Sequence, residues 1–494
     1  MKRILVLGVL ICLSGCAMAP KYDRPKAPIP DRWASGAVDR PAAGALDVTL
    51  LKWREFFTDP KLQRIIEIAL ANNRDLRLAA LNVESARAMY GVKQAELFPA
   101  VNAEAGLSKQ RSSVDYRSAG ASSVTKKYSV DLGITAWEID FFGRIRNLKK
   151  QALEEYLGTE EARRSAQITL VSEVARAYMT IAADRANLNL ARSTLEAQEG
   201  VYNIILRKYK VDLVNEIDLR RAQTQVDAAK SDVARYTQQV AQDQNALNLL
   251  AGSLVPDEFL PVDLANVSPL MDISPGLSSE VLLKRPDIMA AEHQLKGAYA
   301  NIGAARAAFF PSISLTTTIG SASNEFARLF EADKKTWVYS PQVAMPVFDA
   351  RTWSAYRVSE ATRKIALTQY EKTIQTAFKE VADVLAVFAT VDQQIAAQQS
   401  MVDSAWKIYN LSSKRYANGI DSYLSVLDAQ KSFYSAQQGL ISTELAKLIN
   451  NVRAYAVLGG GGWSNDDGIP PGNRDYIEEQ YLSLLDLELR NSER

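Results

Sequence analysis

The sequence predicts a mainly α-helical protein with a smaller β part, built from two similar halves. Three observations support this prediction: a long internal repeat, two proline-free stretches rich in good helix formers, and segments in which apolar and polar residues alternate. A repeat unit of about two hundred residues is far longer than the units of solenoid proteins, which have about 20 to 50 residues. Each half should therefore contain the same run of helices and strands.

The internal repeat aligns residues 70–99 with residues 282–311, and residues 144–223 with residues 351–430. Identical residues fall in register at Leu70/Leu282, Asp75/Asp287, Ala79/Ala291, Ala86/Ala298, Gly91/Gly303, Ala95/Ala307, Phe98/Phe310, Pro99/Pro311, Arg144/Arg351, Tyr209/Tyr416, Ala222/Ala429 and Gln223/Gln430. We predict structural repeats at residues 61–260 and 261–460, followed by a C-terminal tail at residues 461–494.

The N-terminus has the features of an export signal. Lys2 and Arg3 precede ten apolar residues, Ile4–Leu13, which are too few to span a bilayer. Leu13-Ser14-Gly15-Cys16 resembles a bacterial lipobox, so we expect removal of residues 1–15 and attachment of S-diacylglycerol and N-palmitoyl groups to Cys16. More than one acyl chain gives a stable membrane anchor. Ala17 follows the cysteine, which by resemblance to bacterial lipoproteins favours the outer membrane. The alternative is an ordinary signal peptide with an incidental cysteine.

The composition argues against several classes of protein. With 58 basic and 57 acidic residues, the chain lacks the basic surplus of a nucleic-acid binder. Cys12 lies within the signal, so a mature chain with Cys16 alone has no internal disulfide and no thiolate metal cluster. The single histidine, His293, lies in a helix-like stretch, where a surface or packing role is the ordinary one. We expect no metal, no cofactor and no enzymatic activity.

Two proline-free stretches, residues 100–255 and 347–469, can each hold a long helical hairpin, because proline breaks helices. We predict these hairpins at residues 144–252 and 351–458. Their first arms, Arg144–Tyr209 and Arg351–Tyr416, would be about 100 Å long at 1.5 Å per residue. Apolar residues with the 3–4 spacing of a coiled coil support the second arm: Ile374, Ala377, Val381, Val384, Phe388, Val391 and Ile395.

Turns and shorter helices complete each half. The two hairpins should turn near Val211–Ile217 and at Asn418–Asp421, where Asn-Gly readily closes a helix. A shorter helix should begin each half, at Lys61–Leu97 and at residues 286–310. Pro286 and Asp287 suit the first turn of the second of these helices.

Alternating segments predict a β-hairpin in each half, at residues 100–140 and 312–348. Apolar residues at every second position define the strands: Val101, Ala103, Ala105, Leu107, Tyr128, Val130, Leu132, Ile134, Ile313, Leu315, Ile319, Trp337, Tyr339, Val343, Met345 and Val347. The polar segments Ser108–Lys127 and Gly320–Lys335 read as the hairpin loops. Runs of about ten alternating residues are typical of a membrane barrel wall.

The number of strands constrains how such a wall could close. Each chain supplies four strands, whereas membrane barrels have at least about eight, because an open sheet edge is unfavourable in lipid. If these hairpins cross a bilayer, several chains must share one barrel. The alternative is a pair of soluble hairpins packed on the helices.

Motifs through nearly the whole mature chain resemble the outer-membrane factors of the TolC superfamily, in the OprM-like (NodT-type) lipoprotein branch. The matching segments are residues 53–60 (WREFFTDP), 71–76 (ANNRDL), 137–144 (WEIDFFGR), 285–287 (RPD), 303–306 (GAAR), 309–312 (FFPS) and 423–430 (YLSVLDAQ). The resemblance implies a homotrimer with a shared 12-stranded β-barrel in the outer membrane and a long α-helical periplasmic barrel. It also implies that residues 16–60 wrap the equatorial region. The tail at residues 461–494 departs from the pattern and is expected to be equatorial or mobile.

The resemblance also assigns candidate site residues. Leu424 and Asp428 are expected to point into a closed periplasmic constriction, where three copies would form an apolar ring and an acidic ring. Apolar constrictions close by dewetting, and carboxylate rings favour cations. Candidates for latch contacts between neighbouring helix pairs are Asp218, Arg221, Arg415 and Tyr416; Arg221 aligns with Asp428 in the repeat. The alternative for each is a solvated helix face, since surface ion pairs are common and weak.

The implied function is passive export through the outer membrane. The resemblance implies two partners, a periplasmic adaptor and an inner-membrane transporter of the resistance-nodulation-division (RND) class, with drugs or other small solutes as cargo. Metal-ion or type I protein export is the alternative within the family. Two other classes are a structural coiled-coil envelope lipoprotein and an envelope enzyme. The sequence has no histidine pair, free thiol or Gly-x-Ser-x-Gly elbow to support the enzyme.

Overall fold

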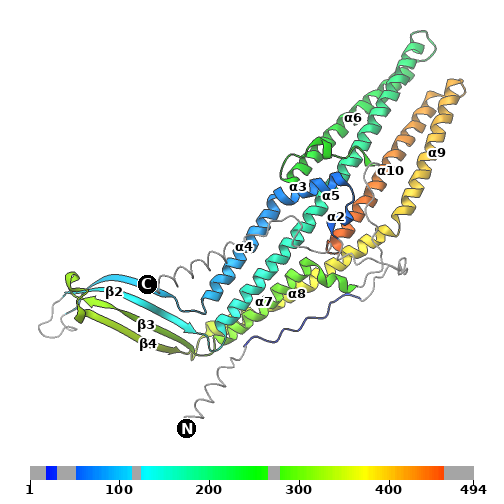
Figure 1. The fold of residues 1–494 in the computed structure, drawn as a ribbon. Coiled ribbons are helices and arrows are strands. Elements are labelled where there is room, and N and C mark those ends of the chain that lie inside the picture. The colour runs from blue at the N-terminus through cyan, green and yellow to red at the C-terminus, as the bar shows by residue number, and fades with distance from the viewer. Residues whose placement is uncertain (1–17, 31–51, 114–123, 265–278, 461–494) are drawn as a thin grey trace. The chain divides into compact units, whose positions relative to one another are not determined.

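The computed structural model describes residues 18–30, 52–113, 124–264 and 279–460. Its helices are α2 (Trp53–Phe56), α3 (Pro60–Asn72), α4 (Arg74–Ala95), α5 (Arg144–Tyr209), α6 (Glu216–Ala251), α7 (Pro286–Ala307), α8 (Ala350–Phe388), α9 (Val391–Ala417) and α10 (Tyr423–Val457), with the strands β1 (Val101–Arg111), β2 (Val124–Ile139), β3 (Ser312–Ser323) and β4 (Lys335–Ala344) (Figure 1). Short 3₁₀ helices lie at Asp257–Phe259, Ser279–Lys284, Phe326–Arg328 and Ala332–Lys334. Cys16 and the tail at residues 461–494 lie outside the described residues.

The chain divides into two compact units. One contains Met1–Ala27, Leu81–Glu161 and Asp287–Thr373, and the other contains Pro28–Ala80, Ala162–Pro286 and Ile374–Arg494. The first unit holds all four described strands. The second holds the ends of both long helical hairpins.

The two predicted β-hairpins join into one antiparallel sheet, with strand order β1-β2-β3-β4. The central pairing places Leu132 opposite Ile319 and Gly133 opposite Thr318. A Cβ atom at Gly133 would lie 2.2 Å from the Thr317 carbonyl oxygen, so only glycine permits this close approach of β2 to β3. The two hairpins thus form one continuous sheet. Two soluble hairpins packed on the helices would have no need to pair with each other.

The strands extend further than their apolar alternation indicates. The sequence pattern predicts a loop at residues 108–111 and 124–127, but these residues pair with one another, from Ser108 opposite Lys127 to Arg111 opposite Val124. The second predicted loop is likewise shorter, because Gly320 and Ser321 pair with Thr336 and Lys335. Backbone hydrogen bonding stabilises these polar ends, although their side chains give no alternating pattern.

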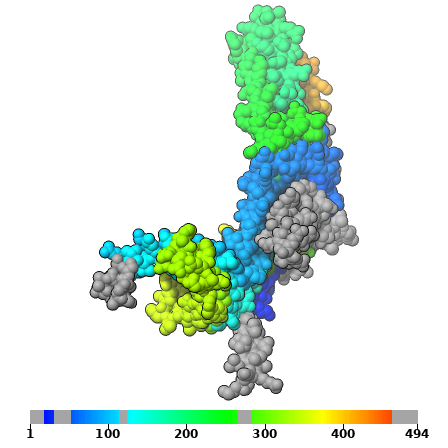
Figure 2. All heavy atoms as spheres, turned by 60° about the vertical axis from the view of Figure 1, so that its left-hand side comes forward, coloured from blue at the N-terminus to red at the C-terminus, as the bar shows by residue number. Residues whose placement is uncertain are grey.

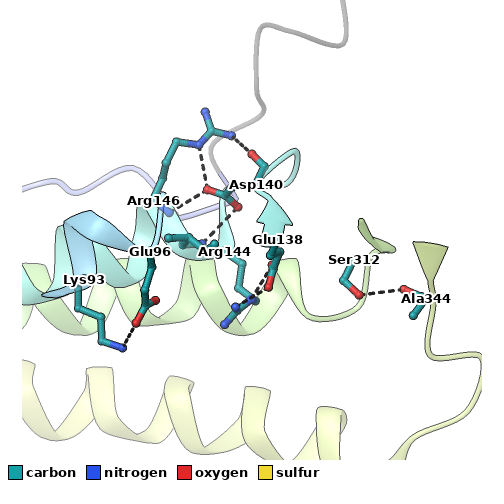
Figure 3. A network of polar contacts seen from close by, with 9 residues as sticks. Lys93, Glu96, Glu138, Asp140, Arg144, Arg146, Ser312 and Ala344 are labelled. Carbon is teal, nitrogen blue, oxygen red and sulfur yellow. Dashed lines mark hydrogen bonds and ion pairs between the residues drawn. The ribbon is translucent and has the colours of Figure 1, made fainter. Parts of the chain in front are cut away.

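Polar contacts join the sheet to the start of α5 within the first unit (Figure 3). The Asp140 carboxylate accepts hydrogen bonds from the backbone nitrogens of Ile145 and Arg146, at 3.2 and 2.9 Å. It thereby satisfies two of the free donors at the helix N-terminus and carries the charge that this end favours. The Arg144 guanidinium donates two hydrogen bonds to the Glu138 carboxylate, at 2.9 and 2.6 Å.

Two of the predicted helices are interrupted. The single helix expected at Lys61–Leu97 is divided at Asn73 into α3 and α4. The Asn73 side chain accepts a hydrogen bond from the Leu76 nitrogen and donates one to the Leu250 carbonyl oxygen, both at 2.9 Å. The Asn73 side chain caps the next helix and thereby stabilises the break between α3 and α4. Helix propensities alone do not predict this break.

The long arm expected at Arg351–Tyr416 is also two helices, α8 and α9, separated at Ala389 and Thr390. The Thr390 nitrogen bonds the Val387 carbonyl, and its hydroxyl donates to the Ala386 carbonyl at 3.2 Å, so the regular ladder is lost there. In the first repeat, α5 runs unbroken through the aligned residues Ala182 and Ala183, which are buried. The two halves therefore differ at this point.

The core of the second unit is centred on aromatic residues from the segment at 53–60. Phe56 and Phe57 are fully buried, and the Phe56 ring stacks on the Tyr455 ring with centroids 5.0 Å apart. The Tyr178 hydroxyl donates a hydrogen bond to the Asp59 carboxylate at 3.0 Å. Asp59 also caps α3 by accepting from the Lys61 nitrogen. Burying aromatic rings of this size contributes much of the stability of a core.

Candidate functional site

The ends of the two long hairpins meet in one apolar cluster within the second unit. Buried residues from α5, α6 and α10 form it: Ile205, Leu219, Ala222, Tyr423, Val426 and Leu427. Each hairpin turns through a residue with positive φ, Asp212 at 56° in the first and Gly419 at 73° in the second. The predicted Asn-Gly turn is confirmed, with glycine in the left-handed region.

Leu424 and Asp428 lie one turn apart on the exposed side of α10. Leu424 is 44% exposed and Asp428 is also exposed, whereas their neighbours Tyr423, Val426 and Leu427 are buried in the cluster. Residues four apart share a helix face. The Asp428 carboxylate has no partner among the described residues. Both side chains are therefore available to face a lumen or a second copy of the chain, and their gate role stays a prediction.

The four latch candidates are near one another but make mostly local contacts. Asp218 and Arg221 lie 3.9 Å apart on the same helix, α6. Arg415 donates two hydrogen bonds, at 2.6 and 3.0 Å, to the carboxylate of Asp421 in the following turn. Arg415 thereby lowers the pKa of Asp421. Asp421 was missed from the sequence, although an acid six residues after Arg415 in a tight turn was a usable signal.

Tyr416 connects the two hairpins. Its ring lies 5.4 Å from the ring of Tyr423 on α10, and the Lys208 ammonium of α5 lies 5.3 Å from the Tyr416 centroid. The Tyr416 and Tyr423 hydroxyl oxygens are buried without a hydrogen-bond partner in the described residues. Burial, with the nearby charge of Asp218, raises the pKa of Tyr416. Burial and the neighbouring tyrosines Tyr416 and Tyr409, with Asp218, raise the pKa of Tyr423 to about 12. This link between hairpins is held by packing and a cation–π contact, which sequence spacing does not reveal.

The sheet carries a wide apolar surface. In strand register, the exposed apolar residues of one face are Val101, Leu107, Leu132, Ile319, Trp337, Tyr339 and Val343. Figure 2 shows both hairpins at the surface, β1–β2 in cyan and β3–β4 in yellow-green. An exposed apolar surface of this extent is typical of a site that meets lipid or another chain. Among the described residues, no helix is long and apolar enough to cross a membrane.

His293 lies beside an acidic residue of a neighbouring helix. Its Nδ1 lies 2.8 Å from the Glu154 carboxylate, and both side chains are largely buried between α7 and α5. The described residues contain no group of three side chains suited to hold a metal ion.

The described N-terminal segment, residues 18–27, is bound to α7 within the first unit. The Arg24 guanidinium and the Tyr22 hydroxyl donate hydrogen bonds to the buried carboxylate of Glu292, at 2.6 and 3.0 Å. Lys296 adds a third contact at 3.2 Å. Glu292 thus fixes this segment, here called the strap, at a point close in sequence to Cys16.

We expect acid to release the strap. Burial raises the pKa of Glu292, but hydrogen bonds from Tyr22 and Lys296, with the charges of Lys296 and Arg24, outweigh it and leave the pKa below its usual value. A lowered pKa gives stabilisation that is present above the ordinary value of about 4.3 and is lost as the pH falls through the folded value. A spin label at Asp23→Cys, in a background with Cys12 and Cys16 replaced by serine, should be immobile at neutral pH and mobile in acid.

Substitution of Glu292 should remove that transition. Glu292→Gln should make the label mobile at every pH, whereas Glu360→Gln, whose partner Tyr356 lies on its own helix, should behave like the parent. A label equally immobile in the parent and in Glu292→Gln would contradict the assignment.

Comparisons with known proteins identify the family. The family model described as outer membrane efflux protein matches residues 65–253 and 277–460. The probable efflux pump outer membrane protein TtgC of Pseudomonas putida is 44% identical over 472 residues, covering 94% of this chain and 97% of the relative. The structure of the open state of the Neisseria gonorrhoeae MtrE outer membrane channel has a TM-score of 0.80 and 34% identity, covering 92% of this chain and all of that one. The chain belongs to the outer membrane efflux protein family.

Proposed function

We propose that the protein is the outer-membrane exit duct of a tripartite efflux system. In this proposal it forms a homotrimer and conducts drugs or other small solutes passively. The observation that carries the proposal is the single four-stranded sheet with an exposed apolar face, in a chain whose helices form two long hairpins. Four strands are too few to close a membrane barrel, so three chains would pool twelve.

The energy for transport is assigned to partners. An inner-membrane RND transporter would deliver the cargo, and a periplasmic adaptor would join it to the exposed helical tips. The names of relatives support small organic cargo: one is called an antibiotic efflux pump outer membrane protein and another a solvent efflux pump outer membrane protein, both from Pseudomonas putida. The proposal includes no enzymatic activity and no nucleic-acid partner.

Liposome swelling tests the channel directly. Purified protein in liposomes should admit small uncharged solutes once the constriction is opened by substitution, while a structural coiled-coil lipoprotein would admit none. A detergent-purified subunit that is monomeric and still passes ions would contradict the pooled barrel. Where genes for a pump and an adaptor lie beside the gene for this protein, deletion of any one of the three genes should raise drug sensitivity to the same extent.

Lipid attachment at Cys16 is part of the proposal and is tested separately. Cys16→Ser should lose its lipid but still form trimers, because the described strands and helical hairpins consist of residues between Val101 and Val457. Metabolic labelling with radioactive palmitate should fall to background in the variant. Retention of the parent's label would contradict the assignment of Cys16, and a second variant, Cys12→Ser, should label as the parent does.

A further inference from the structure

Three exposed cations lie at the far end of the β1–β2 hairpin on one face of the sheet. They are Lys109, Arg111 and Lys126, here called the cation patch. Lys109 is directly opposite Lys126 in the strand register, and Arg111 is opposite Val124. Directly opposed like charges destabilise a strand pair. None of the three has an ion pair among the described residues, and an anion bound here would offset the repulsion between them.

The neighbouring hairpin is neutralised by its own side chains. Arg328 pairs with Glu331 at 2.9 Å, and Lys334 pairs with Asp333 at 2.7 Å. By sequence, residues 320–335 contain three basic and three acidic residues, whereas residues 108–127 contain five basic residues and one acid, Asp115. Asp115 lies outside the described residues. The positive excess therefore belongs to the first hairpin and is not a general property of this end of the sheet.

The cation patch continues the exposed apolar face. Residues directly opposite each other share a face, so Leu107 and Tyr128 lie on the same face as Lys109 and Lys126. Two residues along a strand span roughly 7 Å, so Lys109 and Lys126 lie about that far along the strands from Leu107 and Tyr128. The Tyr128 ring also contacts the Phe326 ring, with centroids 5.5 Å apart. Lys127, opposite Ser108, has the reverse parity and belongs to the other face.

Membrane β-sheets have a recognisable order along their lipid-facing side. An apolar band is bordered by aromatic residues at the level of the lipid headgroups. Lysine and arginine just beyond that border can extend their charged ends to the headgroup phosphates, while their methylene stems remain on apolar surface. Arginine in particular can bind phosphate with two parallel hydrogen bonds.

We propose that the cation patch binds the phosphate groups of the glycolipid in the outer leaflet of the outer membrane. This inference rests on the proposed function, because it requires that the hairpins cross that membrane. Bound phosphate would offset the repulsion between Lys109 and Lys126 and would fix the depth of the hairpin in the bilayer.

Binding of diphosphorylated lipid A to the purified trimer, measured by native mass spectrometry in detergent, tests the proposal. Lys126→Gln should weaken binding about fivefold, and the triple variant Lys109→Gln, Arg111→Gln, Lys126→Gln by at least about tenfold. Lys127→Gln is the matched control, since it removes the same charge from the adjacent residue on the other face, and Lys334→Gln removes a cation that is already paired. Both controls should bind within about twofold of the parent. Raising the salt concentration should weaken binding to the parent.

Each other result would overturn the proposal. Equal loss in Lys126→Gln and Lys127→Gln would indicate attraction by net charge alone. Dissociation of the triple variant into monomers would indicate ion pairs between protomers. Conductance in planar bilayers distinguishes failure of the lipid-binding proposal from failure of the proposed channel function. A triple variant that conducts like the parent and still binds lipid A rejects only the proposal that the cation patch binds lipid phosphate. A Leu424→Ala, Asp428→Ala variant that forms no channel rejects the proposed function.

Discussion

The double variant Leu424→Ala, Asp428→Ala should leak. If three copies of these residues form the constriction, the variant removes an apolar ring and an acidic ring together. We expect mean single-channel conductance in planar bilayers to rise at least about tenfold, which corresponds to lowering the barrier by about 1.4 kcal/mol. The basis is their position one turn apart on the exposed face of α10, at the tip of the second hairpin.

Single substitutions should separate the two rings. Asp428→Asn should lower the preference for cations over anions with little effect on conductance, because it removes charge but not volume. Leu424→Ala should raise conductance by easing wetting. As a control, Leu411→Ala with Asp403→Ala changes an exposed leucine and an exposed aspartate on α9, away from the turn. A double variant with the parent's conductance would reject the gate assignment.

Arg285→Met should destabilise the second unit by about 3 kcal/mol, the usual cost of removing one partner from a buried charged contact. Arg285 is buried, and its guanidinium donates to the Val457 carbonyl and to the Glu380 carboxylate, both at 2.9 Å. Val457 is the last residue of α10, where a cation stabilises the negative end of the helix. Loss of this side chain leaves both acceptors without that donor.

The midpoint of chemical denaturation of the detergent-solubilised protein measures this effect. Arg453→Met is the matched control, because Arg453 also reaches across to α8 but forms only an exposed ion pair of 3.5 Å with Asp383. Exposed pairs contribute between zero and about 1 kcal/mol. Equal midpoints for Arg285→Met and Arg453→Met would show that the buried contact contributes no more to the free energy of unfolding than the exposed ion pair.

Much of the architecture could be predicted from the sequence because its patterns are local and long. The end points of α5 agree with the predicted arm at Arg144–Tyr209, since a proline-free run of good helix formers leaves few alternatives. The two breaks, at Asn73 and at Thr390, could not be predicted in this way. Each depends on side-chain hydrogen bonds to specific backbone groups, and such contacts leave no periodic signal.

The candidate site likewise has features that the sequence predicts and contacts that it does not. Turn chemistry and the repeat locate the hairpin tips, where Arg415 and Tyr416 lie, and the family resemblance assigns Leu424 and Asp428 to the constriction there. The pairing of Arg415 with Asp421 is local and within reach of sequence reasoning. The sequence could not identify Lys208 as the cation over Tyr416, or Glu292 as the anchor of the strap. These two contacts join segments distant in the chain, and periodicity carries no information about which distant residues meet.

The sequence by itself therefore determined the duplication, the helical hairpins, the alternating strands and the family to which the chain is similar. Each of these is recognised from residue types at fixed spacings along the chain. The tertiary structure alone decided that β2 pairs with β3 to make one sheet, and that Lys109 faces Lys126 on its apolar side. Strand register depends on backbone hydrogen bonds between distant segments. A shift of one residue would turn every side chain to the opposite face.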